Sequence, residues 1–201
     1  MTWITEQLQH RGIVDERVLG AMAAVPREAF VLPEDRRFAY DDGPLAIGYG
    51  QTISQPYVVA LMTQELDVAP GARVLEVGTG SGYQTAVLAA MGVDVYSLEI
   101  IPELSERAAG VLSHLGFDRV HLRVGTGYDG WAEEAPFDRI IVTAAPPALP
   151  EELVNQVADG GRLIAPVGGD DQRLIIVDRA GGEIRTRRSI PVRFVRMVRL
   201  R

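Results

Sequence analysis

A buried strand that runs directly into a glycine-rich turn is the feature that most constrains this chain. Residues 74–77 read Val-Leu-Glu-Val, glycines follow at positions 78, 80 and 82, and a helical pattern extends from Tyr83 to about Met91. Glycine has no Cβ, so the backbone of such a turn can approach a ligand closely. The helix that follows points its unpaired N–H groups toward the same place. The sequence therefore predicts a ligand-binding loop between a strand and a helix.

The spacing of these glycines separates two kinds of nucleoside cofactor. The dinucleotide motif G-x-G-x-x-G needs a glycine at position 83, which is Tyr83 here. Glu76 at the strand end is unfavourable beside a pyrophosphate but suits the ammonium of an amino acid. A second apolar run, residues 93–98, ends at Glu99, where a carboxylate can accept hydrogen bonds from a ribose. S-adenosylmethionine has an ammonium, a ribose and no phosphate, so it is the predicted cofactor, and a turn without any ligand is the alternative.

Strands and helices alternate beyond residue 56. Helices are expected at residues 56–66, 83–91, 102–115 and 151–158, and strands at residues 73–77, 93–98, 119–124, 138–143 and 162–167. This alternation predicts an α/β fold with a Rossmann-like, doubly wound and mostly parallel sheet. A C-terminal antiparallel hairpin, residues 172–179 and 183–198, is expected to turn at residues 180–182. Gly160-Gly161 is interpreted as a turn between a helix and a strand.

The N-terminal part precedes this pattern. Residues 4–25 predict an N-terminal helical extension of one or two amphipathic helices, the second of which Asp15 could cap and Pro26 would close. Residues 30–55, rich in proline and glycine, are expected to be extended and loop-rich. Within them, residues 50–57 either fold over the ligand crevice as a lid or simply cap the helix that begins at Pro56, with Ser54 or Gln55 near its N-cap.

Length and composition fit one domain over residues 1–201. A chain with 47% hydrophobic residues can bury a single large core. We expect residues 1–55 to form a helical and lid segment and residues 56–201 to form the Rossmann-like core. There is no cysteine, and we expect no metal site. No apolar run approaches the roughly 18 residues of a membrane span. We therefore expect a soluble, cytoplasmic monomer without membrane partners.

The basic residues gather at the C-terminal end. Seven arginines fall in the last 17 residues without an acid among them, so residues 1–184 carry a charge of −14 while the whole chain carries −7. They are Arg185, Arg187, Arg188, Arg193, Arg196, Arg199 and Arg201. Such a tail can bind nucleic acid, but alternation in residues 190–199 favours a hairpin with arginines on its solvent face. Because the rest of the chain is acidic, we expect no nucleic-acid partner.

Five segments carry a resemblance to a known family: residues 25–30, 40–45, 47–56, 74–85 and 160–168. Over nearly its whole length, the chain resembles the protein-L-isoaspartate O-methyltransferases. The segment Gly50-Gln51-Thr52-Ile53-Ser54-Gln55-Pro56 is specific to that family among methyltransferases. The resemblance implies methylation of the free α-carboxylate of L-isoaspartyl residues in damaged proteins or peptides, with S-adenosyl-L-methionine as the cofactor, as a repair reaction.

The resemblance also implies the site. The implied cofactor-binding residues are Glu76, Gly78, Thr79, Gly80, Ser81, Glu99, Thr126 and Gly127. The implied substrate-binding residues are Thr52, Ile53, Ser54 and Val195, with Ser54 as the catalytic residue. The α-carboxylate, with a pKa of about 3.3–3.7, is already ionised at pH 7, so the reaction needs no general base. Catalysis would rest on proximity and orientation, and His10, His114 and His121 are not expected to take part.

Two departures from the family pattern keep alternatives open. Gly125-Thr126-Gly127 stands where the family has Gly-Asp-Gly, so adenine recognition should weaken or shift, with Asp129 as a possible substitute. Residues 194–198, Phe-Val-Arg-Met-Val, also differ from the family's Phe-Val-Pro-Leu. The alternatives are a diverged methyltransferase that acts on another peptide or small-molecule carboxylate, and a cofactor-binding pseudoenzyme.

Overall fold

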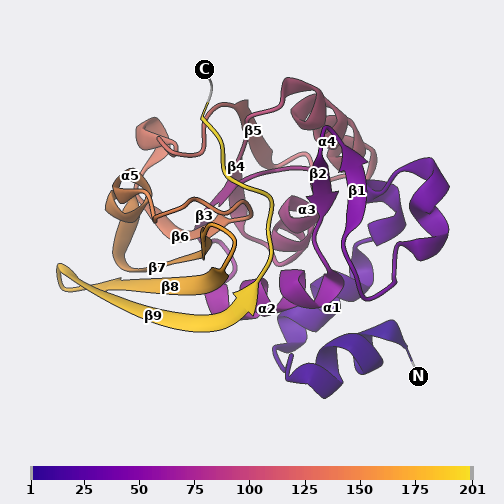
Figure 1. Ribbon diagram of the computed structural model, residues 1–201, viewed down its shortest axis with the longest axis horizontal. Helices are drawn as coiled ribbons and strands as arrows, with labels where there is room; N and C mark the ends of the chain where they lie inside the picture. The colour runs from indigo at the N-terminus through magenta and orange to yellow at the C-terminus, as the bar shows by residue number, and fades with distance from the viewer. Residues whose placement is uncertain (1, 200–201) are drawn as a thin grey trace.

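A seven-stranded sheet lies at the centre of the computed structural model, which describes residues 2–199 (Figure 1). Its strand order is β5-β4-β3-β6-β7-β8-β9. These strands are β3 (Arg73–Val77), β4 (Asp94–Glu99), β5 (Val120–Val124), β6 (Phe137–Val142), β7 (Val157–Gly168), β8 (Gln172–Ala180) and β9 (Glu183–Val192). Strands β3 to β7 pair in parallel, and β8 and β9 continue the sheet antiparallel. The predicted Rossmann-like, mostly parallel sheet with an antiparallel C-terminal hairpin is confirmed.

Both faces of the sheet are buried. Helices α2 (Pro56–Leu66), α3 (Tyr83–Ala90) and α4 (Pro102–His114) pack on one face, where they share a core with Val74 of β3. On the other face, Leu75 packs with α5 (Glu151–Asn155) and the residues around η5 (Ala132–Glu134). Successive strand residues point to opposite faces, so one short strand contributes to both cores. Each fully buried aliphatic side chain contributes about 1.5–3 kcal/mol.

The N-terminal extension is helical but not continuous. It contains η1 (Ile4–Leu8), η2 (Gln9–Arg11) and α1 (Glu16–Ala24), where one or two helices were expected over residues 4–25. The break comes at Gly12, whose φ of +91° belongs to the left-handed region. Asp15 caps α1 as predicted, because its Oδ1 accepts a hydrogen bond from the Arg17 N–H at 2.9 Å. Helix α1 packs against α2 and α3.

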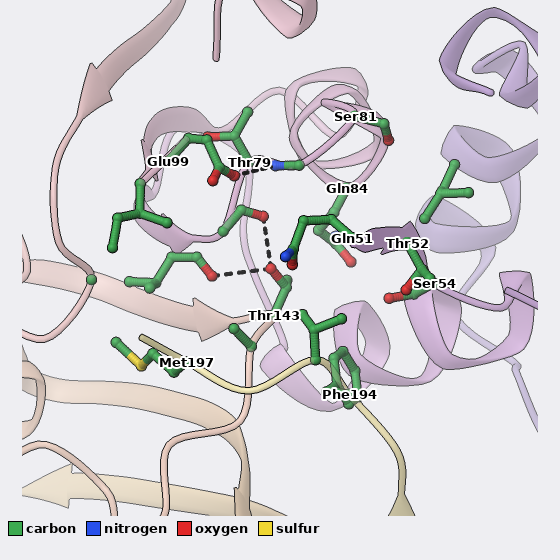
Figure 2. Close-up of a pocket in the computed structure, with 18 of the residues that line it drawn as sticks. Gln51, Thr52, Ser54, Thr79, Ser81, Gln84, Glu99, Thr143, Phe194 and Met197 are labelled. Atoms are coloured by element: carbon green, nitrogen blue, oxygen red, sulfur yellow. Dashed lines mark hydrogen bonds between the residues drawn. The ribbon is translucent and has the colours of Figure 1, made fainter. Parts of the chain in front are cut away.

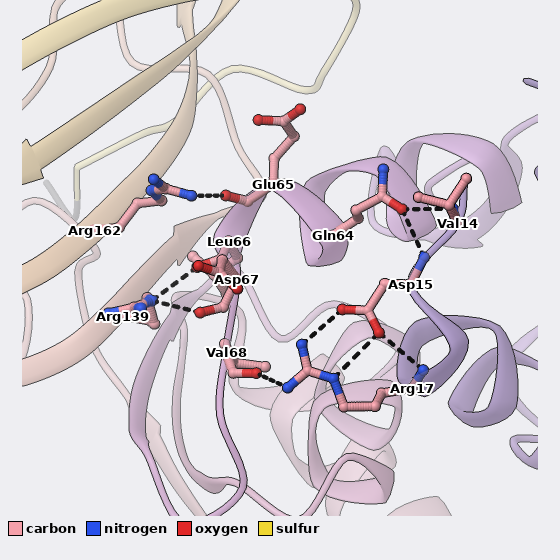
Figure 3. Close-up of polar contacts among 10 residues, drawn as sticks. All are labelled: Val14, Asp15, Arg17, Gln64, Glu65, Leu66, Asp67, Val68, Arg139 and Arg162. Carbon is pink, nitrogen blue, oxygen red and sulfur yellow. Dashed lines mark hydrogen bonds and ion pairs between the residues drawn. The ribbon is translucent and has the colours of Figure 1, made fainter. Parts of the chain in front are cut away.

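The C-terminal end of α2 is where the extension and the sheet are joined (Figure 3). Gln64 Oε1 accepts hydrogen bonds from the backbone N–H groups of Val14 and Asp15, at 2.7 and 3.0 Å. The last carbonyls of a helix lack partners within it. Here Arg162 of β7 donates to the Glu65 carbonyl at 2.8 Å, and Arg139 of β6 binds the next carbonyl in the same way. These bonds fix the direction in which α2 points its N-terminus.

Residues 27–53 are more ordered than the expected loop. They form η3 (Arg27–Phe30), η4 (Pro33–Phe38) and a separate hairpin of β1 (Leu45–Gly48) and β2 (Gln51–Ile53). The sequence analysis missed this hairpin because its strands are very short. Its turn has positive φ at Gly48, Tyr49 and Gly50, and glycines on either side of the tyrosine make that conformation accessible.

Two C-terminal boundaries also differ from the prediction. Helix α5 ends at Asn155 instead of about residue 158, and Gly160-Gly161 lies within β7. Pairing with β6 is irregular there and becomes regular at Arg162, which explains why the pattern suggested a later start. Strand β9 ends at Val192, so the expected strand to residue 198 is wrong. Residues 193–199, the C-terminal segment, instead run back across the molecule (Figure 1).

Within residues 2–199, no helix combines the length and apolar character that crossing a lipid bilayer requires.

Candidate active site

A cavity opens at the carboxyl ends of β3, β4 and β6, between α2 and the C-terminal segment (Figure 2). This is the edge at which doubly wound sheets bind their ligands. Ten of the twelve predicted site residues line it: Thr52, Ile53, Ser54, Gly78, Thr79, Gly80, Ser81, Glu99, Gly127 and Val195. Glu76 and Thr126 do not.

The glycine loop, residues 78–82, is held close to the end of β6. The φ angles of Gly78, Gly80 and Gly82 are +102°, +55° and +89°, which only glycine adopts readily. A Cβ on Gly78 would lie 2.4 Å from Oγ1 of Thr143. That hydroxyl donates to the carbonyls of Val77 and Gly78, at 3.0 and 2.7 Å (Figure 2). The glycine at position 78 is therefore required by the close contact between this loop and the end of β6.

Glu99 both lines the cavity and shapes it. Its Oε2 accepts a hydrogen bond from the Gly80 N–H at 2.7 Å, and its Oε1 accepts one from the Ile101 N–H at 3.0 Å. A carboxylate oxygen has two lone pairs, so each oxygen keeps acceptor capacity for a ligand hydroxyl. The residue is only 5% exposed, and that exposure is toward the cavity.

Glu76 lies behind the glycine loop and does not line the cavity, so its predicted part in cofactor binding would be exerted from behind the loop. Its neighbour Val77 faces the cavity, and alternation along β3 turns Glu76 to the opposite face. There its Oε2 accepts hydrogen bonds from the hydroxyls of Ser97 and Thr85, at 2.6 and 2.5 Å. Its Oε1 is buried without a partner among the described residues. Burial raises the pKa of Glu76 to about 7.

Thr126 also lies outside the cavity lining. Its Oγ1 accepts a hydrogen bond from the Tyr128 N–H at 3.3 Å, which closes a local turn and keeps the hydroxyl out of the cavity lining. Gly127 does line the cavity, and a Cβ there would lie 2.1 Å from Val77 and 2.8 Å from Met197. This wall is therefore made of backbone and apolar side chains.

Ser54 lies between β2 and α2 and borders the cavity (Figure 2). The alternative that it caps α2 is wrong, because the N-cap is Gln55 and no side-chain capping bond forms. Pro56 begins the helix as predicted, since its missing N–H costs nothing at that position. The Ser54 side chain is therefore not committed to helix capping.

Arg27, which the sequence analysis did not single out, holds the backbone at Ser54. It is fully buried, and its guanidinium donates to the carbonyls of Ala39 and Ser54, both at 2.7 Å. The same group lies 4.8 Å from the ring centre of Tyr83, which lines the cavity. Burial lowers the pKa of Arg27 to about 10, so it stays cationic at pH 7. Its only signal in the sequence was its position within residues 25–30.

The C-terminal segment forms the remaining wall. The Val195 carbonyl accepts a hydrogen bond from the Ala145 N–H at 2.8 Å, and the Met197 N–H donates back to Ala145 at 2.9 Å. Gln172 binds both the N–H and the carbonyl of Phe194, at 2.7 and 3.1 Å. Val195 is thus fixed at the cavity, as predicted, although not by a strand.

Several lining residues were missed. They include Gln51, Val58, Val59, Met62, Tyr83, Gln84, Phe194 and Met197. The signal for Tyr83 and Gln84 was their place just after the glycine loop. The three histidines do not line the cavity, and no group of three or more His, Asp or Glu suited to a metal ion occurs in residues 2–199.

Comparison with known proteins places this cavity in context. Residues 2–201 match the sequence profile of the family described as protein-L-isoaspartate(D-aspartate) O-methyltransferase. The chain is 52% identical to the protein-L-isoaspartate O-methyltransferase of Gloeobacter violaceus, with 98% of this chain and 97% of the relative covered. It is 54% identical to that of Halorhodospira halophila, covering 97% and 90%.

A solved structure of a putative member of the same family is also similar to this chain. It is a putative protein-L-isoaspartate O-methyltransferase from Plasmodium falciparum in complex with S-adenosyl-L-homocysteine. It is similar to this chain with a TM-score of 0.86 and 31% identity, over 98% of this chain and 97% of that one.

Proposed function

The chain belongs to the protein-L-isoaspartate(D-aspartate) O-methyltransferase family, and from this premise we propose how its own residues serve the reaction. The enzyme methylates the free α-carboxylate of L-isoaspartyl residues in damaged proteins and peptides, as a repair step. Its cofactor, S-adenosyl-L-methionine, supplies a methyl group activated by a sulfonium. The observation that carries the proposal is that Glu99, the glycine loop and Ser54 line one cavity in a chain that matches the family throughout.

The cavity offers hydrogen-bond acceptors and a backbone surface that suit this cofactor. Glu99 keeps one acceptor position free on each oxygen for the two ribose hydroxyls. Gly78, Thr79, Gly80 and Ser81 provide a backbone cradle, and the glycine at 78 lets this cradle pack directly on Thr143. Glu76 acts from behind this cradle, through its negative charge when ionised, instead of by contact. The residues present therefore fit a nucleoside that carries an ammonium and no phosphate.

The adenine end relies on shape in place of a charged acceptor. Gly125 and Gly127 line the wall with Leu98 and Met197, while the Thr126 side chain bonds within its own turn. A flat apolar slot of this kind can hold a purine by burying its faces. The loss of the family's aspartate is compatible with cofactor binding, because the remaining contacts do not depend on that side chain.

The substrate end has to hold a carboxylate that is already ionised. Ser54 donates a hydrogen bond to it and orients one oxygen toward the methyl group, while Thr52, Ile53 and Val195 exclude water. No proton has to be removed, so a single neutral donor is sufficient. The gain comes from fixing the two reacting groups together, an effect that can reach about 7–11 kcal/mol. Arg27 keeps the Ser54 backbone in place.

The proposal extends to the domain organisation, location and partners of the protein. Residues 1–201 form one domain, in which residues 1–55 are the helical and lid segment and residues 56–201 the Rossmann-like core. The protein acts as a cytoplasmic monomer and does not require nucleic acid. The −7 charge of the chain supports the last point, because phosphate backbones favour basic proteins.

A methyl-transfer assay tests the function. An isoaspartyl peptide should accept a methyl group from S-adenosyl-L-methionine, and its aspartyl twin, identical in composition, should not. Calorimetry with the cofactor alone separates binding from turnover. Cofactor binding without methylation of the isoaspartyl peptide would contradict the proposed activity and favour a pseudoenzyme.

A further inference from the structure

A second cavity adjoins the active site on the substrate side. It encloses about 490 Å³, enough for more than one amino-acid side chain. Six residues line both cavities: Thr52, Ser54, Val58, Thr143, Phe194 and Val195. Because Ser54 lies on the shared boundary, a peptide whose isoaspartyl carboxylate reaches Ser54 has its neighbouring residues at the second cavity.

The charges that line this second cavity are all positive. Arg11 and Arg193 line it, and no Asp or Glu does within the described part of the chain. This contrasts with the first cavity, which is lined by both Glu99 and Arg196, and with the overall charge of −7. A local excess of one sign in a cleft selects ligands of the opposite sign.

The two arginines are not equivalent. Arg11 is already engaged, because its guanidinium lies 2.9 Å from a carboxylate oxygen of Asp42 and stacks 3.6 Å from the ring centre of Tyr57. Among residues 2–199, no acid forms an ion pair with Arg193. Arg193 is also exposed and lies two residues from Val195, a separation of at most about 7 Å along the chain.

We propose that Arg193 forms a subsite for a second carboxylate in the substrate, the side chain of an aspartate or glutamate one or two residues from the isoaspartyl position. This inference rests on the proposed function, and it adds a substrate preference to it. Arg11 also lines the cavity, but its guanidinium is already held by Asp42 and Tyr57, so we do not assign it this role. The enzyme would then act preferentially on damage sites in acidic segments of proteins.

The expected size of the preference is modest because Arg193 is exposed to solvent. A charge pair of this kind should change kcat/KM by about threefold to tenfold at low ionic strength. Added salt should reduce the preference, since the Debye length falls to about 3 Å at 1 M. The reaction itself is unchanged, so the effect should lie mainly in KM.

The test is a series of isoaspartyl peptides. Glutamate, glutamine or lysine is placed, one position at a time, at the first and second positions before the isoaspartyl residue and at the first and second positions after it. For each peptide, kcat/KM is measured at low and high salt. In at least one position, the native enzyme should prefer glutamate over glutamine, and glutamine over lysine. Arg193→Gln should lose this order, and Arg193→Glu should invert it. Arg188→Gln is the matched control, because Arg188 is exposed on β9 but does not line either cavity, and it should keep the order.

The outcomes separate the two proposals. If every isoaspartyl peptide is methylated with the same kcat/KM, or if Arg193→Glu keeps the native order, the carboxylate subsite is wrong and the proposed function stands. If no isoaspartyl peptide is methylated, both are wrong. Because each enzyme is judged by the ratio between its own peptides, partial loss of folded protein in a variant does not affect the result.

Discussion

The two ends of the active site are built in different ways. At the cofactor end, Glu99 and the glycine loop sit on the ends of buried parallel strands and are joined by backbone hydrogen bonds. At the substrate end, Ser54 and Val195 lie on segments outside the sheet, held by Arg27 and Ala145. The cofactor is always the same molecule, whereas the damaged proteins differ. A rigid strand-end site suits the first, and peripheral segments can vary in sequence to suit the second.

The largest expected effect concerns charge at the substrate end. Ser54→Asp should fold and bind S-adenosyl-L-methionine with nearly native affinity, yet lose about a thousandfold in turnover. Two like charges about 4 Å apart repel by about 4 kcal/mol at an effective dielectric constant of 20, and this repulsion would oppose the substrate carboxylate. Steady-state methylation and calorimetry measure the two quantities.

A neutral variant of similar size serves as the control for that change. Ser54→Asn should retain much more turnover than Ser54→Asp, because it can still donate a hydrogen bond. Native turnover in Ser54→Asp would show that Ser54 does not orient the substrate carboxylate, and that the substrate end does not have the role proposed for it.

The next effect concerns stability at the cofactor end. The pKa of Glu76 is raised from 4.5 to about 7 by burial, so the folded protein holds this proton more tightly than the unfolded chain. The corresponding stabilisation is complete below about pH 4.5 and is lost as the pH rises to about 7, on the order of 3 kcal/mol. Relative to Glu76→Gln, the native protein should therefore lose free energy of unfolding over this interval. Denaturant titrations at pH 4.5, 6 and 8 would reveal it, and a constant difference would argue against a buried, proton-binding carboxyl.

Removal of the Glu99 carboxylate should weaken the cofactor end directly. Glu99→Ala should cost about 1.5–3 kcal/mol of cofactor binding, roughly 10- to 150-fold in Kd, because hydrogen bonds to a charged group are lost. Asp94→Ala, at the partly exposed start of the same strand, is the control and should bind as the native protein does. Equal affinity in Glu99→Ala would remove this residue from the ribose site.

The smallest effect is expected at Thr126. Its side chain does not line the cavity, so Thr126→Ala should change cofactor affinity by less than about twofold. Loss of its hydrogen bond to the Tyr128 N–H should lower stability by about 0.5–1.5 kcal/mol. A larger loss of cofactor affinity than of stability would show that Thr126 takes part in adenine binding after all.

The sequence was informative where structure is determined locally. The strand, the glycine loop and Glu99 follow from burial and spacing over short distances, and the boundaries of α2 were predicted to the residue. Nothing in the sequence indicated that Glu76 lies behind the glycine loop, because a strand buried on both faces does not show which of its residues meet the cavity. Arg27 was missed because its partners are 12 and 27 residues away. The C-terminal segment was read as a strand because its alternation continues past Pro191, and only pairing in three dimensions reveals where β9 ends.

The arginines of β9 have a further consequence at the free edge of the sheet. Within residues 2–199, strand β9 pairs only with β8, and residues 183–188 are exposed. An unpaired edge invites another chain to extend the sheet, and charged side chains and proline oppose this. A second copy approaching edge to edge would bring Arg185, Arg187 and Arg188 against their own counterparts. An enzyme that handles damaged, partly unfolded chains meets many exposed strands, and an edge of this kind keeps them from being captured as an added strand.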